Sequence, residues 1–137
     1  MRSRILFISG HRDDARNLSQ MLQNLPLILD YVGSLHHART MLQQEDYDVI
    51  LTEAIFPDGN WIDVLHLARE SPRELEVIVT DPHADARLWA EALNLGVYDL
   101  LAQPFYQPEV RRILYNACCR PAYEHNSSAP TGLSAAG

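Results

Sequence analysis

Five short apolar runs alternate along the chain with segments whose apolar residues recur at helical spacing. The runs predict β-strands at residues 4–9, 27–32, 48–53, 75–80 and 97–102. Each run is nearly continuous in apolar residues, which is typical of parallel strands that are covered on both faces. Strict alternation of strands with helices predicts an α/β domain with a parallel sheet, right-handed crossovers and helices on both faces.

Residues at the boundaries of the runs predict where the helices begin. Asp13 and Asp14 follow the first run, and their charges suit the positive N-terminal end of a helix. Ser34 is expected to cap the second helix. Asp81 is expected to cap the fourth, with Pro82 at the first helical position, where its missing N–H has no cost. The last helix has the fullest apolar stripe, formed by Val110, Ile113, Leu114, Ala117 and Cys118.

Composition limits the class of partner. The chain has 137 residues, enough for one domain, and 47% apolar residues, which is ordinary for a globular protein. Its net charge of −7 argues against binding to DNA, RNA or an anionic membrane. No apolar run approaches the roughly 20 residues of a transmembrane helix, so a cytoplasmic location is expected. The neighbours Cys118 and Cys119 are interpreted as reduced thiols, and Arg111 and Arg112 as solvated charges.

The carboxyl ends of the predicted strands carry the polar residues from which a site would be built. Open parallel sheets place their sites at these ends, beside the point where the strand order reverses. The residues there are Ser9, Gly10, Glu53, Thr80 and Gln103. Glu53 places a carboxylate at the mouth of the sheet, and a loop at residues 54–60 follows it.

Three segments give the chain its most specific pattern. They are residues 48–59, residues 77–80 and residues 96–105, the last reading Gly-Val-Tyr-Asp-Leu-Leu-Ala-Gln-Pro-Phe. With them, residues 3–120 resemble the receiver domain of bacterial response regulators. The resemblance implies a flavodoxin-like (βα)5 three-layer sandwich, with a five-stranded parallel sheet in the order 2-1-3-4-5. Residues 121–137 are small and polar and are expected to form a flexible tail or linker.

The same resemblance implies phosphoryl transfer that this chain lacks the groups to perform. In the family, an Asp that ends strand three accepts the phosphoryl group, an acidic pair holds Mg²⁺ and a Lys contacts the phosphoryl oxygens. A hydroxyl on strand four and an aromatic residue on strand five form the switch. The chain retains the hydroxyl as Thr80 and departs elsewhere, with Ser9 and Gly10 at the acidic pair, Glu53 at the acceptor, Gln103 at the Lys and Leu100 at the aromatic residue.

These departures predict a degenerate receiver that works without phosphorylation, without a metal and without a cofactor. Phosphoryl transfer depends on neutralising charge, and neither a divalent cation nor a cationic side chain is expected here. Glu53 has two interpretations. Its longer carboxylate mimics a phosphorylated Asp, or it is a solvated or locally hydrogen-bonded group, and we favour the second.

A protein partner or a second copy of the chain is the expected ligand, and no enzymatic activity is expected. In the family, helix four, strand five and helix five form the output face. Aromatic residues are predicted on that face at Trp89, Tyr98, Tyr106 and Tyr115. Exposed aromatic side chains suit partner docking, whereas burial of each ring in its own domain remains an equal alternative.

Two further hypotheses stay open. The domain is a regulatory part of a larger transcription regulator, with the C-terminal tail as its linker. Alternatively, the remains of the phosphorylation pocket, with His11, Glu53 and Thr80, bind a small ligand or metal as a sensor. His11 is expected near Glu53, but no histidine has the spacing of a metal site with a third ligand. Asp13 and Asp14 are expected to belong to the first helical turn and not to replace the acidic pair.

Overall fold

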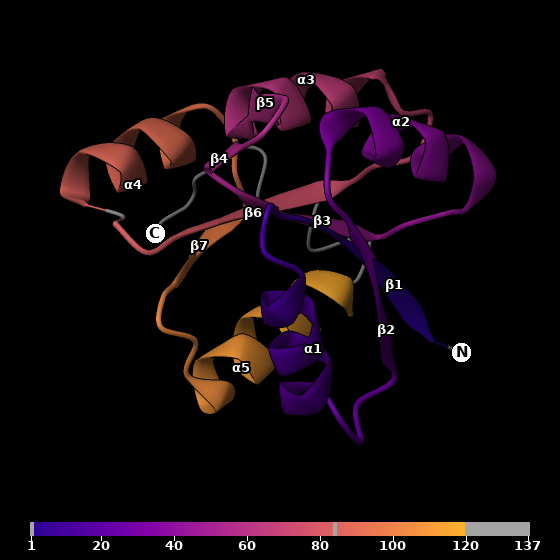
Figure 1. The fold of residues 1–137 in the computed structure, drawn as a ribbon, viewed down its shortest axis with the longest axis vertical. Helices are drawn as coiled ribbons and strands as arrows, with labels where there is room; N and C mark the ends of the chain where they lie inside the picture. The colour runs from indigo at the N-terminus through magenta and orange to yellow at the C-terminus, as the bar shows by residue number, and fades with distance from the viewer. Residues whose placement is uncertain (1, 84, 120–137) are drawn as a thin grey trace, which may run out of the picture.

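The alternation in the sequence produces a five-stranded parallel sheet in the order β2-β1-β3-β6-β7 (Figure 1). The computed structural model describes residues 2–83 and 85–119, so the predicted tail lies outside the described residues. The strands of the sheet are β1 (Ser3–Ile8), β2 (Leu27–Val32), β3 (Val49–Glu53), β6 (Glu76–Asp81) and β7 (Asp99–Ala102). Counted among themselves, they follow the predicted order 2-1-3-4-5, and the predicted fold class is confirmed.

Helices cover both faces of this sheet. They are α1 (Arg12–Met21), α2 (Leu35–Gln44), α3 (Trp61–Glu70), α4 (Ala86–Asn94) and α5 (Gln107–Cys118). Figure 1 shows α1 and α5 below the sheet and α2, α3 and α4 above it. Alternate side chains of each strand therefore enter different cores, so that Ile5 and Phe7 pack with α1 and α5 while Leu6 and Ile8 pack on the other face. No helix in the described part of the chain is long and apolar enough to span a bilayer.

The register brings the polar strand ends together. Within the sheet, Ile8 pairs with Thr52 and Glu53 pairs with Thr80. The ends of β1, β3 and β6 therefore lie side by side at one edge of the sheet. This is the edge at which the sequence predicted a site.

The fourth helix begins later than predicted. Asp81 is the last residue of β6, and its side chain accepts a hydrogen bond of 2.7 Å from the N–H of His83 in a tight turn. Asp85 is the N-cap instead, and its carboxylate accepts the N–H of Leu88 at 2.9 Å. The prediction of Asp81 as the cap is therefore wrong, because an Asp side chain can bond the backbone two residues ahead in a turn as well as cap a helix.

A small hairpin replaces the predicted loop between β3 and α3. Strands β4 (Ile55–Phe56) and β5 (Gly59–Asn60) pair antiparallel, with Asp58 at the tip. The carboxylate of Asp58 accepts the N–H groups of Leu35 at 2.7 Å and His36 at 3.2 Å. The hairpin is thereby attached to the first turn of α2. Ser34 caps this helix, as predicted.

Asp58 provides a test of this attachment through the pH dependence of stability. The hydrogen bond from Leu35 N–H is the main cause that lowers the pKa of this carboxyl group. A lowered folded-state pKa stabilises the fold above the unfolded value of about 3.9 and the effect is lost as pH falls through the folded value. Asp58→Asn should therefore lower Tm at pH 7 by the equivalent of about 0.3–1 kcal/mol, and the difference should shrink below pH ~4. A pH-independent difference in thermal melts would contradict this assignment.

Arg111 on α5 is a structural contact and not a solvated charge as predicted. Its Nη1 donates to the carbonyl oxygens of Met21 at 3.0 Å and Gln23 at 2.8 Å. Both carbonyls lie at the C-terminal end of α1, where the helix leaves acceptors unpaired and favours a cation. Arg111 therefore links α5 to the C-terminal end of α1, and both helices cover the same face of the sheet.

Removal of this link should be measurable against its neighbour. Arg111→Met keeps most of the aliphatic stem and removes the donors, and we expect a loss of about 1 kcal/mol, or roughly 4 °C in Tm. Arg112→Met is the matched control, because Arg112 is exposed and its substitution changes the net charge by the same amount. Equal effects of the two substitutions in urea or thermal unfolding would show that the contacts of Arg111 do not stabilise the fold.

Candidate functional site

Glu53 ends a fully buried strand, and its side chain is buried with it. The residue is 5% exposed. Oε1 accepts the backbone N–H of Gly10 at 2.9 Å, and Oε2 lies 2.9 Å from Nδ1 of His11. A carboxylate removed from water needs such partners, because an unpaired one carries a large desolvation cost. The burial of Glu53 contradicts its interpretation as a solvated group. The hydrogen bonds from Gly10 and His11 agree instead with a locally hydrogen-bonded carboxylate.

The turn after β1 is shaped to receive this carboxylate. Ser9 is buried, and its Oγ accepts the N–H of His11 at 2.8 Å. Gly10 has no side chain, and a Cβ at this position would lie 3.3 Å from Cδ of Pro57 and 4.0 Å from Oε1 of Glu53. The missing side chain therefore allows the turn to pack closely against the Pro57 ring.

His11 closes the site from the solvent side. Its side chain is 73% exposed, whereas that of Glu53 is 7% exposed. The hydrogen bond to Glu53, followed by the negative charge of Glu53, raises the pKa of His11. A protonated His11 would form an ion pair with Glu53, so this carboxylate has a potential cationic partner that the sequence did not identify.

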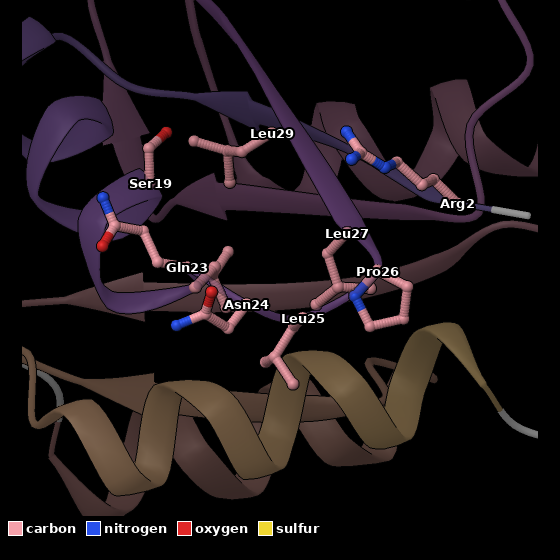
Figure 2. Close-up of a pocket in the computed structure, with 9 residues that line it drawn as sticks. Arg2, Ser19, Gln23, Asn24, Leu25, Pro26, Leu27 and Leu29 are labelled. Carbon is pink, nitrogen blue, oxygen red and sulfur yellow. The ribbon is translucent and has the colours of Figure 1, made fainter.

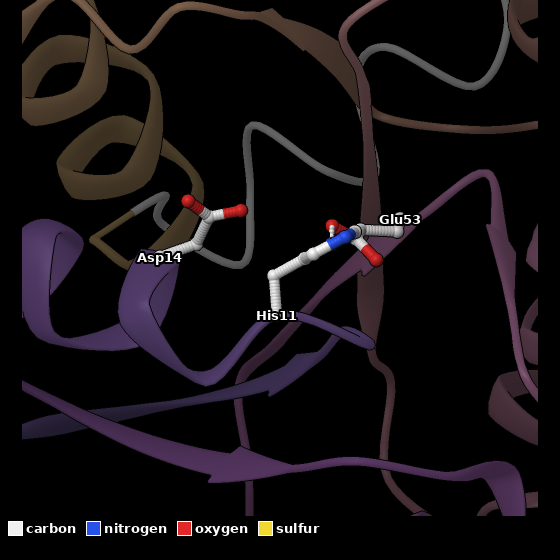
Figure 3. Close-up of side chains that lie close together, drawn as sticks. All are labelled: His11, Asp14 and Glu53. Carbon is white, nitrogen blue, oxygen red and sulfur yellow. Dashed lines mark hydrogen bonds and ion pairs between the residues drawn. The ribbon is translucent and has the colours of Figure 1, made fainter.

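Asp14 also lies at the site, which the sequence did not predict. It lies in the first turn of α1, as expected, but this turn directs its carboxylate toward His11 and Glu53 (Figure 3). Ligand atoms of the three residues all lie within 4.8 Å of one another. Burial, followed by the charge of Glu53, raises the pKa of Asp14. Membership of a helix did not exclude Asp14, because the first turn of α1 begins directly beside the end of β3.

Thr80, one of the two switch positions, is held by hydrogen bonds on the other side of β3 from His11. Thr80 is buried and donates its hydroxyl to the carbonyl of Leu101 at 2.7 Å, while Nε2 of Gln103 donates to the same hydroxyl at 3.1 Å. Leu100 is buried in the core, at 2% exposure. The Gln103 amide is thus directed to Thr80 although the residue also lines the hollow beside Glu53.

The arrangement does not fit the Mg²⁺ ion that receiver domains hold. Mg²⁺ is bound through carboxylate and carbonyl oxygens in near-octahedral geometry. The hydroxyl of Ser9 is hydrogen-bonded to the backbone of His11, and Gly10 has no side-chain oxygen. No lysine exists anywhere in the sequence, so no side chain of that type replaces Gln103 as the phosphate contact. The residues at the family's ligand positions therefore supply none of its charged groups.

The predicted aromatic residues differ in their degree of exposure. Trp89 on α4 and Tyr115 on α5 are each 39% exposed, and Tyr106, which precedes α5, is 66% exposed. Tyr98 is half-buried and packs against the core beneath α1 and α5. Three of the four predicted aromatic residues therefore present surface, together with Leu93 of α4, which is 50% exposed.

A second hollow lies far from Glu53, between the end of α1 and the start of β2 (Figure 2). Its volume is about 590 Å³, and Leu25, Pro26 and Leu27 form much of its wall. Arg2 is the single charged residue among those that line it. Ser19, Gln23 and Asn24 also line it, but none of its residues supplies a carboxylate, an imidazole or a thiol. The hollow of about 430 Å³ beside His11, Asp14 and Glu53 is the chemically richer of the two.

Comparisons with known proteins agree with the fold. The transcriptional regulatory protein DpiA of Escherichia coli (strain K12) is 32% identical over 72 residues, which cover 53% of this chain and 32% of that protein. The response regulator protein PilR of Pseudomonas aeruginosa is 22% identical over 116 residues, which cover 85% of this chain and 26% of that protein. The chain thus spans about a third or less of these curated relatives.

A solved structure and a family model extend the similarity to almost the whole domain. The crystal structure of a signal receiver domain from Vibrio parahaemolyticus superposes with a TM-score of 0.82 at 18% identity, covering 96% of this chain and 100% of that one. The model of the response regulator receiver domain matches residues 5–115. With the sheet order and the polar strand ends in the positions described above, the chain belongs to the family of response regulator receiver domains.

Proposed function

We propose that this receiver domain acts in two-component, phosphorelay-type signalling without being phosphorylated, by binding another protein. The proposal rests on the hydrogen bonds that already engage the carboxylate of Glu53. Both oxygens of this carboxylate, at the position where the family accepts phosphate, are engaged by Gly10 and His11. In the proposal the chain performs no catalysis of its own and works in the cytoplasm.

The geometry supports the loss of phosphoryl transfer on three grounds. The acceptor is longer by one methylene than an Asp, and a displacement of about 1 Å costs roughly 10²-fold in rate. The Mg²⁺ ligands are absent at Ser9 and Gly10. Nε2 of Gln103 carries no charge and is directed to Thr80. Each change removes charge neutralisation or positioning, on which phosphoryl transfer depends.

The pairing of Glu53 with His11 also bears on the idea that this side chain mimics a phosphorylated Asp. A mimic that drives the switch would engage the hydroxyl of Thr80. That hydroxyl is instead donated to Leu101 and accepts from Gln103. The carboxylate of Glu53 contacts Gly10 and His11 in the turn after β1, on the opposite side of β3 from Thr80, which supports a structural role for it.

The proposed binding surface is the face formed by α4, β7 and α5, at the left of Figure 1. Ala92 is the buried residue of α4, whereas α5 buries Val110, Ile113, Leu114 and Ala117. Helix α4 therefore commits little of its apolar side to the core and presents Trp89 and Leu93, one turn apart, to solvent. Exposed Trp and Tyr side chains are typical of the centres of protein–protein interfaces.

The second candidate function is that of a regulatory domain within a larger transcription regulator. The relatives reported above are regulators of which the chain covers about a third or less. In that setting the α4-β7-α5 face would contact an output domain or a second receiver. The chemistry proposed for Glu53 is the same in both settings.

Exposure to a phosphodonor tests the first part of the proposal. We expect the purified chain, incubated with acetyl phosphate and Mg²⁺, to show no added phosphoryl group by intact-mass spectrometry, because acceptor, cation site and Lys are all changed. A receiver domain with an Asp acceptor, treated in parallel, shows that the donor is active. Stoichiometric labelling of the chain, mapped to Glu53, would overturn the proposal.

Sedimentation velocity of the purified chain tests the proposed surface in its self-associating form. We expect concentration-dependent association that Trp89→Ser combined with Leu93→Ser abolishes, because burial of these side chains supplies most of the apolar area. Ile55→Ser is the matched control, since Ile55 is the most exposed large apolar residue at 76% and lies on β4. Association that survives the double substitution, or that Ile55→Ser abolishes, would place the interface elsewhere.

A further inference from the structure

Three potential metal ligands converge from three separate segments of the chain. His11 comes from the turn after β1, Asp14 from the first turn of α1 and Glu53 from the end of β3 (Figure 3). Their ligand atoms lie within 4.8 Å of one another. Within residues 2–83 and 85–119, they are the one group of three His, Cys, Asp or Glu side chains that meets this condition.

The pocket has more negative than positive charge. Two carboxylates face a single imidazole, and within the described residues the one ion pair of Glu53 is with His11. Arg12 and Asp13 also line the hollow, and the guanidinium of Arg12 lies over the Tyr31 ring, 6.0 Å from the ring centroid. Ligand atoms of Asp14 and Glu53 lie within 4.8 Å of each other, and like charges this close repel one another. A divalent cation would relieve this repulsion.

The buried member of the group is oriented before any ion arrives. The N–H of Gly10 holds Oε1 of Glu53, which leaves Oε2 directed toward His11. Such a hydrogen bond to the second oxygen of a ligating carboxylate is the usual outer-shell support of a metal site. The hollow of about 430 Å³ beside these side chains provides room for an ion and for water.

The spacing requires only small movements of side chains. Ligand atoms that bind zinc tetrahedrally at about 2.0–2.2 Å stand roughly 3.3–3.5 Å apart. Nδ1 of His11 and Oε2 of Glu53 are 2.9 Å apart, and the largest separation in the group is no more than 4.8 Å. His11 is largely exposed and Asp14 is only partly buried, so both are free to adjust around Glu53.

The ligand types select the class of metal. One imidazole nitrogen with two carboxylate oxygens suits Zn²⁺ and similar transition-metal ions, whereas Mg²⁺ prefers oxygen ligands alone. We propose that His11, Asp14 and Glu53 bind a divalent transition-metal ion of the zinc class, with water in the remaining position. The ligands differ from the family's acidic pair, because Ser9 and Gly10 contribute none. The inference deepens the proposed function and rests on it, since the metal would act in the pocket from which phosphate chemistry has been lost.

Calorimetric titration of the full chain with zinc sulfate, after treatment with EDTA and without a histidine tag, tests the site. We expect one equivalent of Zn²⁺ to bind, and an excess of Mg²⁺ not to compete. His11→Ala and Asp14→Asn should each weaken the affinity at least about tenfold, because each removes a direct ligand. Both residues lie at the surface, so these variants should fold even if Glu53→Gln does not, and circular dichroism verifies it.

Two matched variants separate this site from general attraction of metal ions. Glu91→Gln changes the charge by the same amount at an exposed position of α4, outside the hollow, and His36→Ala with His37→Ala removes the adjacent histidine pair on α2. Both should leave zinc affinity unchanged. Absence of zinc binding, binding that survives His11→Ala and Asp14→Asn, or binding that either control abolishes would overturn the inference. None of these outcomes changes the phosphodonor result, so the inference and the proposed function fail separately.

Discussion

A carboxylate that is buried at the end of a parallel sheet constrains everything around it. Glu53 needs hydrogen bonds from its own surroundings, and it receives them from the turn that joins β1 to α1. In that turn, Gly10 places its backbone N–H and His11 places its imidazole beside the end of β3. The same requirement fixes where α1 begins and therefore where Asp14 lies. The site is thus organised around one desolvated charge and the groups that compensate for it.

Most of the fold was predictable because a strand that is buried on both faces has a nearly continuous run of apolar residues. All five strands of the sheet appeared in this way, and strict alternation with helices then determined a parallel sheet. Ends were less predictable, since one residue type serves different structures. Asp81 closes a turn where Asp85 caps the helix, and the same chemistry suits either task. The β4-β5 hairpin escaped notice because two residues per strand are too few to show a period.

The site was predictable in position and only partly in content. Sheet topology placed Glu53, Thr80 and Gln103 at one edge, and the sequence alone suggested that His11 lies near them. Asp14 was missed because its approach depends on the direction in which α1 leaves the turn, which no local pattern encodes. The hydrogen bond of Gln103 to Thr80 was missed for a related reason, since rotamers are chosen by neighbours distant in sequence. A carboxylate at the first turn of a helix after a strand is nevertheless a signal that can be sought.

The contact between Gly10 and Pro57 has a consequence for how such a domain evolves. A side chain added at Gly10 would begin 3.3 Å from Cδ of the Pro57 ring and 4.0 Å from Oε1 of Glu53. An acidic residue there would crowd the proline ring and bring a second negative charge close to the buried carboxylate. Restoring this member of the acidic pair is therefore coupled to adjustment at Pro57 and Glu53.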